Sequence, residues 1–596
     1  MNTLNKATQQ LNWLRNQING IYPSTGKGLF YMFPIEAGIG KTRTMVETLK
    51  ELTIKQPWKK SVVVTALVKD AKNIAKEIGK GNAVAIYAGA QVDEHRLSDV
   101  PVIVITHQKY RLLCNTNIHF YRQQKDIIFA GRHNLIIDEE LHLLDTVGAS
   151  YEDFYRVRQC FKECDVKYLE LFDNAFGHLM KAGAHMHDKG WEAHIYKGKR
   201  VLDIDLLLEK TVKLKEFPIG LSLGKILWDD YMPRSKEELY SWTLDLCNIA
   251  KADRYFCDGF GFCALNNNCD YISLENNIIL DASANLYEIY KESPHFKVMD
   301  MPMVRTYKKW KLHHIYANTS ASYKKAHSNW LEKAMPEVIK MCTPKDRKIL
   351  IIGSKKDMGD GPLEGKTKKA IQKKLATLKN HAQVEYTYFQ VMRGKNNWRD
   401  FDTCIVLHTP AKPPSFVWSM VERYAPHIKM KKNGLHMQRN GKDDTEHYGC
   451  ADPILDQVRE DDLLSTIYQA VNRINRSNEK NAEILLITRN TNLVTRLKRR
   501  LVGIRNGITP RKQKIRRQKN VSTDRCRQLK KLLDEIIQGR HMKYETDDCC
   551  YPKSYLSKKL GVRSISPYLK KIRVFLRNRA ITVHNRYLKI SKYDFC

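Results

Sequence analysis

The stretch LFYMFPIEAGIGKTRTMVETLKELTI, residues 29–54, decides the fold class of this chain. It joins an apolar run to an amphipathic helical pattern through a turn that contains two glycines. Such a turn lets backbone N–H groups converge on phosphate oxygens, while the following Lys neutralises phosphate charge and the Thr hydroxyl reaches Mg²⁺. Ile35 stands where the full pattern has its first Gly. The stretch still predicts a nucleotide-binding loop formed by Gly38, Ile39, Gly40, Lys41 and Thr42.

Strand patterns on both sides of this loop predict an α/β fold with parallel sheets. Strands buried in a parallel sheet appear as near-continuous apolar runs, and crossover helices separate them. Runs of this kind alternate with helical patterns at residues 61–67, 101–106, 134–137, 348–353, 403–408 and 482–488. We therefore expect two parallel-sheet lobes, with the nucleotide-binding loop in the first.

Two acids directly follow the apolar run at residues 134–137. In nucleotide hydrolases a strand of this kind presents a carboxylate to Mg²⁺, and an adjacent acid polarises the attacking water. We therefore expect Asp138 and Thr42 to hold Mg²⁺ and Glu139 to be the catalytic base. The alternative is a solvated acidic start to the next helix, which is the usual meaning of an acidic run.

Changes in pattern divide the 596 residues into segments. The alternation of strands and helices fades after about residue 150 and returns near residue 277, and the composition becomes strongly basic after residue 496. We expect a first lobe at 1–149, a mostly helical insertion at 150–276, a return to the first lobe with a connector at 277–330, a second lobe at 331–496, a basic linker at 497–522 and a C-terminal domain at 523–596.

Charge indicates a polyanion as the partner. Lys and Arg number 101 against 65 Asp and Glu, so the formal net charge is +36. A field of that sign attracts nucleic acid, although a generally basic surface or binding to a membrane surface are alternatives. No stretch predicts a membrane span or a secretion signal, and the 14 cysteines are scattered. We expect a cytoplasmic protein with reduced thiols that binds nucleic acid and no membrane.

Short motifs in a fixed order resemble those of superfamily 2 helicases of the DEAD/DEAH type. AGIGKT at residues 37–42 is similar to motif I, and IIDEELH at residues 136–142 is similar to motif II. LDASAN at residues 280–285 resembles the Ser-Ala-Thr motif III, with Asn in place of Thr. QAVNRINR at residues 469–476 resembles motif VI, with Asn472 in the Gly position. The resemblance implies two RecA-like lobes that use ATP and Mg²⁺ to move along nucleic acid.

The resemblance also implies roles for individual residues. Gln469 would sense the nucleotide, and Ser283 with Ala284 would couple its state to movement between the lobes. Arg473 and Arg476 would reach across the cleft as arginine fingers, toward charge that grows on the γ-phosphate during hydrolysis. The alternative for the two arginines is pairing with surface acids, because their spacing places them on one face of a helix.

The insertion between motifs II and III resembles the layout of XPD/DinG-like helicases and of helicases from mobile elements or phages. The XPD/DinG branch has iron–sulfur cysteines before motif II, where this chain has only Cys114. Cys247, Cys257, Cys263 and Cys269 lie close together before motif III, and none is paired as C-x₂-C. We expect a turn-rich aromatic hairpin in which these cysteines are small buried thiols, and no structural metal, with a zinc or iron–sulfur site as the alternative.

The C-terminal domain resembles a winged helix-turn-helix. Helical patterns at residues 524–539, 551–560 and 564–578 precede an alternating stretch at 580–590, which is typical of a two-stranded wing. The third helix of that architecture enters the major groove of DNA. Its exposed face would carry Ser566, Lys570, Lys571, Arg573 and Arg577, and its core face Ile565, Leu569, Ile572 and Leu576. The alternative is a small domain that docks onto the motor or a partner protein.

These observations favour an ATP-dependent DNA helicase or translocase, active in the replication of a mobile element or phage-like replicon. One alternative is a DNA-binding initiator or regulator that uses ATP as a conformational switch and unwinds nothing. The other is an RNA helicase. Strand displacement separates the first alternative from the helicase, and competition between single-stranded DNA and RNA separates the second.

Overall fold

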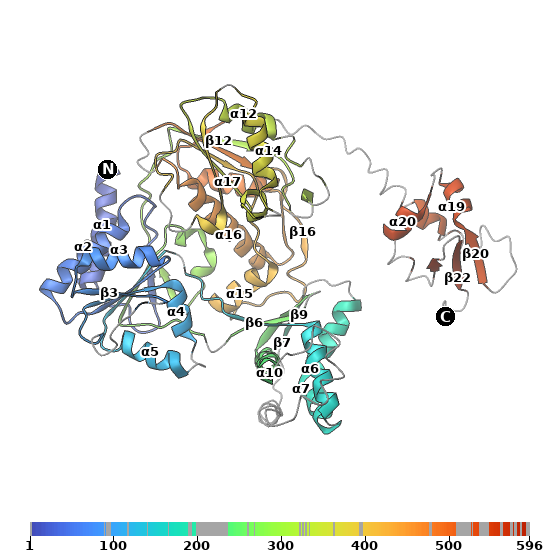
Figure 1. Cartoon of the computed structure of the whole chain (residues 1–596), viewed down its shortest axis with the longest axis horizontal. Helices are drawn as coiled ribbons and strands as arrows, with labels where there is room; N and C mark the ends of the chain where they lie inside the picture. The colour runs from blue at the N-terminus through green and yellow to red at the C-terminus, as the bar shows by residue number, and fades with distance from the viewer. Residues whose placement is uncertain are drawn as a thin grey trace. The chain divides into compact units, whose positions relative to one another are not determined.

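The computed structural model of the chain divides into two compact units, Met1–Thr509 and Pro510–Cys596 (Figure 1). Within the ranges that the structure describes, no helix is long and apolar enough to cross a bilayer. These ranges are residues 3–88, 90, 97–115, 119–139, 141–164, 166–188, 194–197, 236–258, 261–266, 269–320, 323–324, 327, 330–332, 334–361, 364–378, 380–392, 397–475, 480–507, 526, 528–533, 535, 548–560, 564–571, 576, 581–583 and 587–591.

The first unit contains a parallel sheet in which the strands lie in the order β11-β1-β10-β5-β2-β4-β3. The apolar runs predicted near residues 61, 101 and 134 are confirmed as β2, β4 and β5, each of which is buried along its whole length. The strands are β1 (Phe30–Met32), β2 (Ser61–Thr65), β3 (Ala83–Ile86), β4 (Val102–Thr106), β5 (Asn134–Asp138), β10 (Asn276–Leu280) and β11 (Phe296–Val298).

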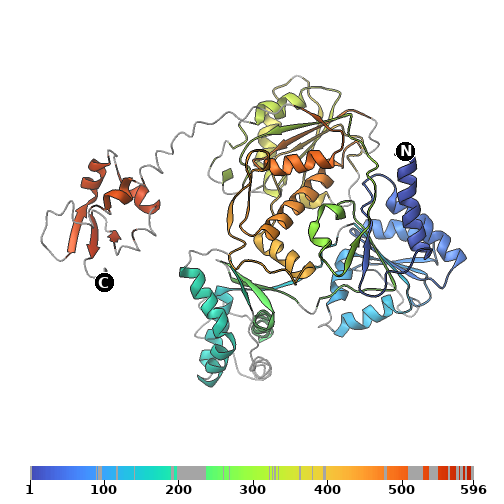
Figure 2. The ribbon, with the colours of Figure 1, turned by 180° about the vertical axis from the view of Figure 1, so that it is seen from behind.

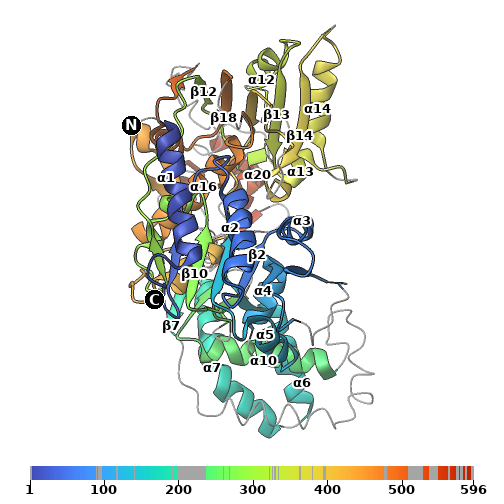
Figure 3. The ribbon, with the colours of Figure 1, turned by 90° about the vertical axis from the view of Figure 1, so that its left-hand side faces the viewer.

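Helices cover both faces of this sheet. Helices α1 and α2 lie side by side on one face (Figure 3), where Leu49 of α2 shares a core with Val63 of β2. The neighbouring Val62 points to the opposite face and shares a core with Tyr110 of α4, as the period-2 alternation of a strand requires. The helices are α1 (Thr3–Asn19), α2 (Lys41–Lys55), α3 (Val68–Ile78), α4 (His107–Cys114) and α5 (His119–Phe129).

A second parallel sheet follows in the same unit, with the strand order β14-β13-β15-β18-β12-β19. The three predicted runs are confirmed as β13, β15 and β18. β12 also belongs to this sheet, so part of the segment 277–330 that we assigned to the first lobe and a connector is second-lobe structure. The strands are β12 (Trp310–Ile315), β13 (Lys348–Gly353), β14 (Gln383–Tyr388), β15 (Thr403–Val406), β18 (Ala482–Ile487) and β19 (Arg505–Asn506).

The helices of the second lobe are α12 (Met335–Cys342), α13 (Lys355–Met358), α14 (Lys366–Leu375), α15 (Pro414–Tyr424), α16 (Pro453–Val471) and α17 (Thr491–Arg500). An antiparallel hairpin of β16 (Met437–Asn440) and β17 (His447–Cys450) precedes α16. Helix α17 extends past the predicted start of the linker at residue 497, because Leu497 and Leu501 are buried in the core. β19 then pairs with β12, so the segment predicted as a linker begins as folded structure.

The segment between motifs II and III combines helices with an antiparallel sheet of order β6-β9-β8-β7. The helices were predicted, and Figure 2 shows α6 and α7 (teal) side by side. The aromatic hairpin predicted around Cys257 and Cys263 is confirmed as β8 and β9, whereas the pairing of β6 and β7 with this hairpin was not predicted. The elements are β6 (Thr146–Ser150), α6 (Tyr151–Cys164), α7 (Val166–Asp188), β7 (His194–Lys197), α10 (Lys236–Lys251), β8 (Arg254–Cys257) and β9 (Gly261–Leu265).

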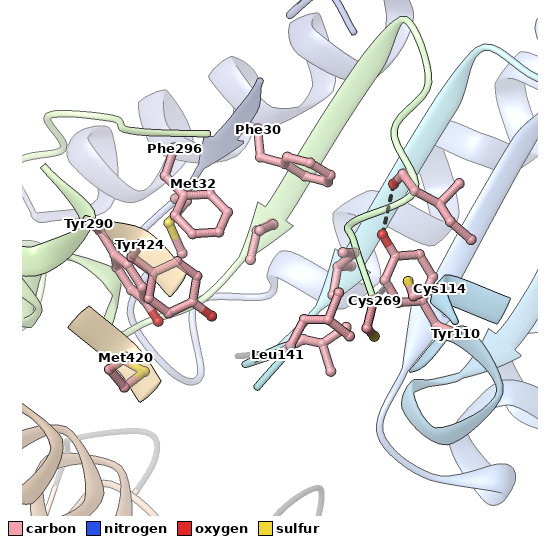
Figure 4. Close-up of a cluster of buried hydrophobic side chains, with 14 of the residues drawn as sticks. Phe30, Met32, Tyr110, Cys114, Leu141, Cys269, Tyr290, Phe296, Met420 and Tyr424 are labelled. Atoms are coloured by element: carbon pink, nitrogen blue, oxygen red, sulfur yellow. Dashed lines mark hydrogen bonds between the residues drawn. The ribbon is translucent and has the colours of Figure 1, made fainter. Parts of the chain in front are cut away.

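Helix α15 belongs to the second lobe by sequence but lies in the hydrophobic core of the first. Trp418 and Val421 of this helix are fully buried in the cluster that contains Phe30 of β1. The rings of Tyr424 and Phe296 have centroids 5.2 Å apart, and Figure 4 shows both in one group of buried side chains. The two lobes therefore share apolar packing as well as a connecting segment.

The C-terminal unit has its own small core. Within it β20 (Asp548–Pro552), β22 (Tyr587–Ser591) and β21 (Ile581–Val583) form an antiparallel sheet, with α19 (Lys553–Lys559) and α20 (Ser566–Lys571) between β20 and β21 in the chain. The predicted pairing of the last two strands is confirmed. Ile565, Leu569 and Leu576 are buried as predicted, whereas residue 572 lies outside the described ranges.

Candidate active site

The carboxyl ends of neighbouring strands bring the predicted loop and the predicted acids together. β10 pairs in parallel with β1 on one side and with β5 on the other, which places Leu280 opposite Asp138. Parallel strands end at the same edge of a sheet, and ligands of open α/β sheets bind at that edge. The loop after β1, Asp281 after β10 and Glu139 after β5 accordingly line one cavity of about 440 Å³.

The predicted phosphate loop joins β1 to α2, and two of its glycines have left-handed backbone angles. Gly38 and Gly40 have φ values of 87° and 107°, which glycine adopts without the steric cost that other residues meet. The first residues of α2 line the cavity, so a helix N-terminus, which attracts anions, faces it. Lys41 Nζ donates to the carbonyl oxygen of Leu280 at 2.9 Å and lies 3.9 Å from Asp138 Oδ1. Ile39 instead packs against the core of the first lobe.

Asp138 has the surroundings of a cation ligand. Thr42 Oγ1 donates to Asp138 Oδ2 at 2.9 Å, whereas Asp138 Oδ1 accepts no hydrogen bond from the described residues. The residue is 6% exposed, and burial raises the pKa of its carboxyl while the Lys41 ammonium acts in the opposite direction. Mg²⁺ binds to proteins through hard oxygen ligands, often one or two carboxylates. This hydroxyl and carboxylate therefore fit Mg²⁺.

Glu139 sits in a strained backbone conformation at the end of β5. Its φ is 75°, a left-handed value that costs a non-glycine residue of the order of 1–2 kcal/mol. Its N–H donates to the Leu280 carbonyl at 3.1 Å, which fixes this turn against β10. Strain of this kind concentrates at functional sites. The side chain is half-buried and lines the cavity, so an acid faces the space beside Asp138.

Asp70 is a further acid of this cavity that the sequence analysis missed. It lies in the first turn of α3 and lines the cavity together with Asp138 and Glu139. Burial raises the pKa of Asp70, and the charges of Glu139 and Asp138 raise it further. No local pattern marked this residue, because an acid in the first turn of a helix is ordinary.

The predicted coupling residue Ser283 meets the predicted sensor Gln469 across the two lobes. Gln469 Nε2 of α16 donates to Ser283 Oγ at 2.8 Å. Ser283 Oγ in turn donates to Asp281 Oδ1 at 2.7 Å, and the Ser283 N–H donates to the same oxygen at 2.9 Å. Ala284 is fully buried at the start of the 3₁₀ turn that follows. Asp281 was not predicted, although it precedes Ser283 by only two positions.

Motif VI supplies the opposite wall of the cavity. Arg473 lines it and is 9% exposed, so a buried arginine of the second lobe lies at the same cavity as the phosphate loop of the first. Arg476 lies outside the described residues. The lining residues are Ala37, Gly38, Gly40, Lys41, Thr42, Arg43, Val46, Thr65, Asp70, Asn73, Ile74, Glu77, Asp138, Glu139, Asp281, Ala282, Tyr468, Gln469, Asn472 and Arg473.

The predicted cysteine cluster does not converge on one point. Cys247 and Cys257 belong to the core of the insertion, whereas Cys269 belongs to the core of the first lobe. Tyr151 OH lies 2.9 Å from Cys257 Sγ, and burial raises the pKa of that thiol to about 12. Among the residues that the structure describes, no group of three or more His, Cys, Asp or Glu is arranged to hold a metal ion.

The structure describes little of the predicted DNA-binding face. Ser566 is exposed at the start of α20. Lys570 and Lys571 lie in the same helix, and their side chains are outside the description. Arg573 and Arg577 lie outside the described residues, so their role stays a prediction.

No protein family and no curated protein matches this chain by sequence. Among solved structures, Xpd4 from S. tokodaii is similar with a TM-score of 0.46 and 12% identity, over 84% of this chain and 99% of that chain. An XPD helicase is similar with a TM-score of 0.43 and 12% identity, over the same shares of each chain. The DUF1998 helicase MrfA bound to DNA and AMPPNP is similar with a TM-score of 0.32 and 10% identity, over 100% of this chain and 62% of that chain. In this chain the phosphate loop of the first lobe and helix α16 of the second lobe line the same cavity.

Proposed function

We propose that this protein is an ATP-dependent motor that moves along nucleic acid, as a helicase or translocase. One observation carries the proposal: the phosphate loop, two carboxylates at the end of β5 and residues of motif VI line a single cavity between lobes. Because residues of both lobes complete the hydrolytic site, the state of the bound nucleotide is coupled to the distance between the lobes.

Each residue has a definite part in the proposed hydrolysis of ATP. Lys41 and the N-terminus of α2 bind the phosphates, while Thr42 and Asp138 hold Mg²⁺, which neutralises phosphate charge when bound. Glu139 accepts a proton from the attacking water, since it faces the cavity without taking part in the Thr42–Asp138 pair. Arg473, and by analogy Arg476, stabilises the charge that develops on the γ-phosphate.

A larger cavity in the second lobe supports nucleic acid as the track. It has a volume of about 1570 Å³ and lies at the carboxyl ends of β12, β13 and β15. Its walls combine the basic side chains that neutralise phosphates with aromatic rings on which bases stack. Those side chains are Lys356, Lys366, Lys374, Lys412, Trp330 and Phe389, whereas Lys324 of the same wall pairs with Asp357 at 2.5 Å.

We further propose that the C-terminal unit delivers the motor to duplex DNA, in the replication of a mobile element or phage-like replicon. The support is the order of its elements, with α19 and α20 followed by the β21–β22 hairpin, and the basic residues in the same stretch. Proteins that bind DNA through a helix followed by a wing use basic residues to contact phosphates.

The test measures ATP hydrolysis with and without single-stranded DNA or RNA, next to strand displacement on duplexes with 5′ or 3′ tails. We expect hydrolysis that nucleic acid stimulates and Lys41→Ala abolishes, together with displacement of one tailed substrate. Stimulated hydrolysis without displacement on any substrate would favour the ATP-switch alternative, and stimulation by RNA alone would favour an RNA helicase. Absence of ATP hydrolysis under all conditions would refute the proposal.

A further inference from the structure

A buried cluster of charged and polar groups connects the phosphate loop to motif VI through the segment that joins the two lobes. Glu36, which directly precedes the loop, is 1% exposed. Its Oε2 accepts the backbone N–H groups of Val304 at 2.7 Å and Arg305 at 2.9 Å, both between β11 and β12. The hydroxyl of Tyr468, on α16, donates to Glu36 Oε1 at 3.5 Å. A carboxylate of the first lobe thus holds the connecting segment and touches the second lobe.

The guanidinium of Arg305 completes the connection. It is 7% exposed and donates to three oxygens: Ala37 O at 3.3 Å, Asn472 Oδ1 at 3.3 Å and Asn475 O at 3.0 Å. Ala37 belongs to the phosphate loop, and the two asparagines bracket Arg473 in motif VI. A single planar donor therefore fixes the distance between the loop and the turn that carries the proposed arginine finger.

Asn472 is the point at which this chain departs from the motif VI pattern, where Gly is usual. Its Oδ1 accepts from Tyr307 OH at 2.8 Å as well as from Arg305, and its Nδ2 donates to Tyr468 O at 2.8 Å. A glycine has no side chain and could make none of these bonds. Asn475, with a φ of 41°, adds a left-handed turn directly after Arg473 and Ile474. Asn472, which stands where the pattern has Gly, thus supplies a side-chain acceptor for the Arg305 guanidinium.

We propose that Glu36 and Arg305 are positioning residues, which set the motif VI turn against the phosphate loop so that Arg473 meets the γ-phosphate. The inference rests on the proposed ATP site. Burying a carboxylate and a guanidinium is opposed by the loss of their hydration, so such groups are weak evidence for stability. Here both charges lie where residues of the two lobes and of the connecting segment meet. Arg305 acts through Asn472 and Ala37, and it contacts no reacting atom.

The inference predicts a loss of turnover with little loss of nucleotide binding. Misplacing a catalytic group by about 1 Å can cost about 10²-fold in rate. We expect Arg305→Ala to lower kcat about 10- to 100-fold per bound nucleotide, and to change the Kd of a fluorescent ATP analogue less than about 3-fold. Arg305→Lys should restore only part of the rate, because an ammonium lacks the planar fork that reaches several acceptors at fixed angles.

A double-mutant cycle with Asn472→Ala tests whether Arg305 acts through Asn472. The double variant should be no slower than the slower single variant, because both substitutions break the same contact. Arg254→Ala is the matched control. Arg254 also has a partly buried guanidinium, which pairs with Glu422 at 2.8 Å and donates to Ile428 O at 3.0 Å, far along the chain from the phosphate loop. This variant should lose stability and keep its kcat per bound nucleotide.

The outcomes separate this inference from the proposed function. A parent protein that hydrolyses ATP, a dead Lys41→Ala variant and an Arg305→Ala variant with parental kcat per bound nucleotide would overturn the positioning role and leave the motor intact. A lowered melting temperature in Arg305→Ala with unchanged kcat would likewise reduce Arg305 to a structural residue. A parent protein without ATPase activity would overturn both.

Discussion

The hydrogen bond between Gln469 and Ser283 allows the coupling between the lobes to be measured. Gln469 Nε2 donates to Ser283 Oγ at 2.8 Å, and the bond is partly buried. A neutral hydrogen bond of this kind contributes about 0.5–1.5 kcal/mol net. Because about 1.4 kcal/mol corresponds to a factor of ten in rate, breaking the bond should lower the DNA-stimulated kcat about 2- to 12-fold.

Ser283→Ala, Gln469→Ala and the double variant form the cycle that isolates this bond from the second bond of Ser283 to Asp281. The assay is steady-state ATP hydrolysis at saturating ATP, with and without saturating single-stranded DNA. The matched control is Gln457→Ala, since Gln457 donates to Asp461 on the same helix α16 at 2.7 Å and does not contact Ser283. Losses that add in the double variant would refute a role for this bond in coupling.

The other predictions concern hydrolysis and DNA binding. Lys41→Ala should abolish ATP hydrolysis and leave DNA affinity largely intact, since that affinity comes from basic surfaces; a near-normal rate would remove the loop from the mechanism. Glu139→Gln should bind ATP and hydrolyse it about 10²- to 10⁴-fold more slowly in single-turnover measurements, and a parental rate would place the base elsewhere. Arg473→Ala should lose about 10³-fold or more in kcat while nucleotide binding persists, whereas equal losses would indicate a structural ion pair. Deletion from Thr523 onward should keep ATPase activity on single strands and weaken duplex binding with a shallower salt dependence, and an unchanged salt slope would contradict DNA delivery by this unit. The same loss of duplex binding is expected from joint Ala substitution of Lys570, Lys571 and Arg573.

The fold of both lobes could be predicted because their signals are local. The strands that were predicted, such as β2, are short apolar runs, and the turn before Lys41 has glycines where the backbone takes positive φ. The position of Asp138 at the end of its strand could be predicted from a local signal too, and Thr42 Oγ1 donates a hydrogen bond to it there. The separate roles of Gln469 and Ser283 followed from family resemblance alone, and their contact was not predicted, since nothing in either segment specifies the other.

Contacts between distant segments left no local pattern, so they could not be predicted. Arg305 lies in a short basic stretch that is typical of an exposed connector, yet it is buried by partners from both lobes. In the insertion, the outer strands β6 and β7 were missed because strands of four or five residues show no clear period. Asp70 was missed because its importance depends on the fold of β5 and not on its own neighbours.

The position of α15 has a consequence for how this protein is made. Strands β1, β10 and β11 complete the first sheet once residue 298 has been synthesised, but Trp418 and Val421 leave the ribosome much later. Until then the apolar side of those strands, around Phe30 and Phe296, has no cover from α15. Chains generally fold domain by domain during synthesis, and exposed apolar surface makes partly synthesised chains prone to aggregation. A fragment that ends between the lobes would therefore lack the helix that covers this part of the core.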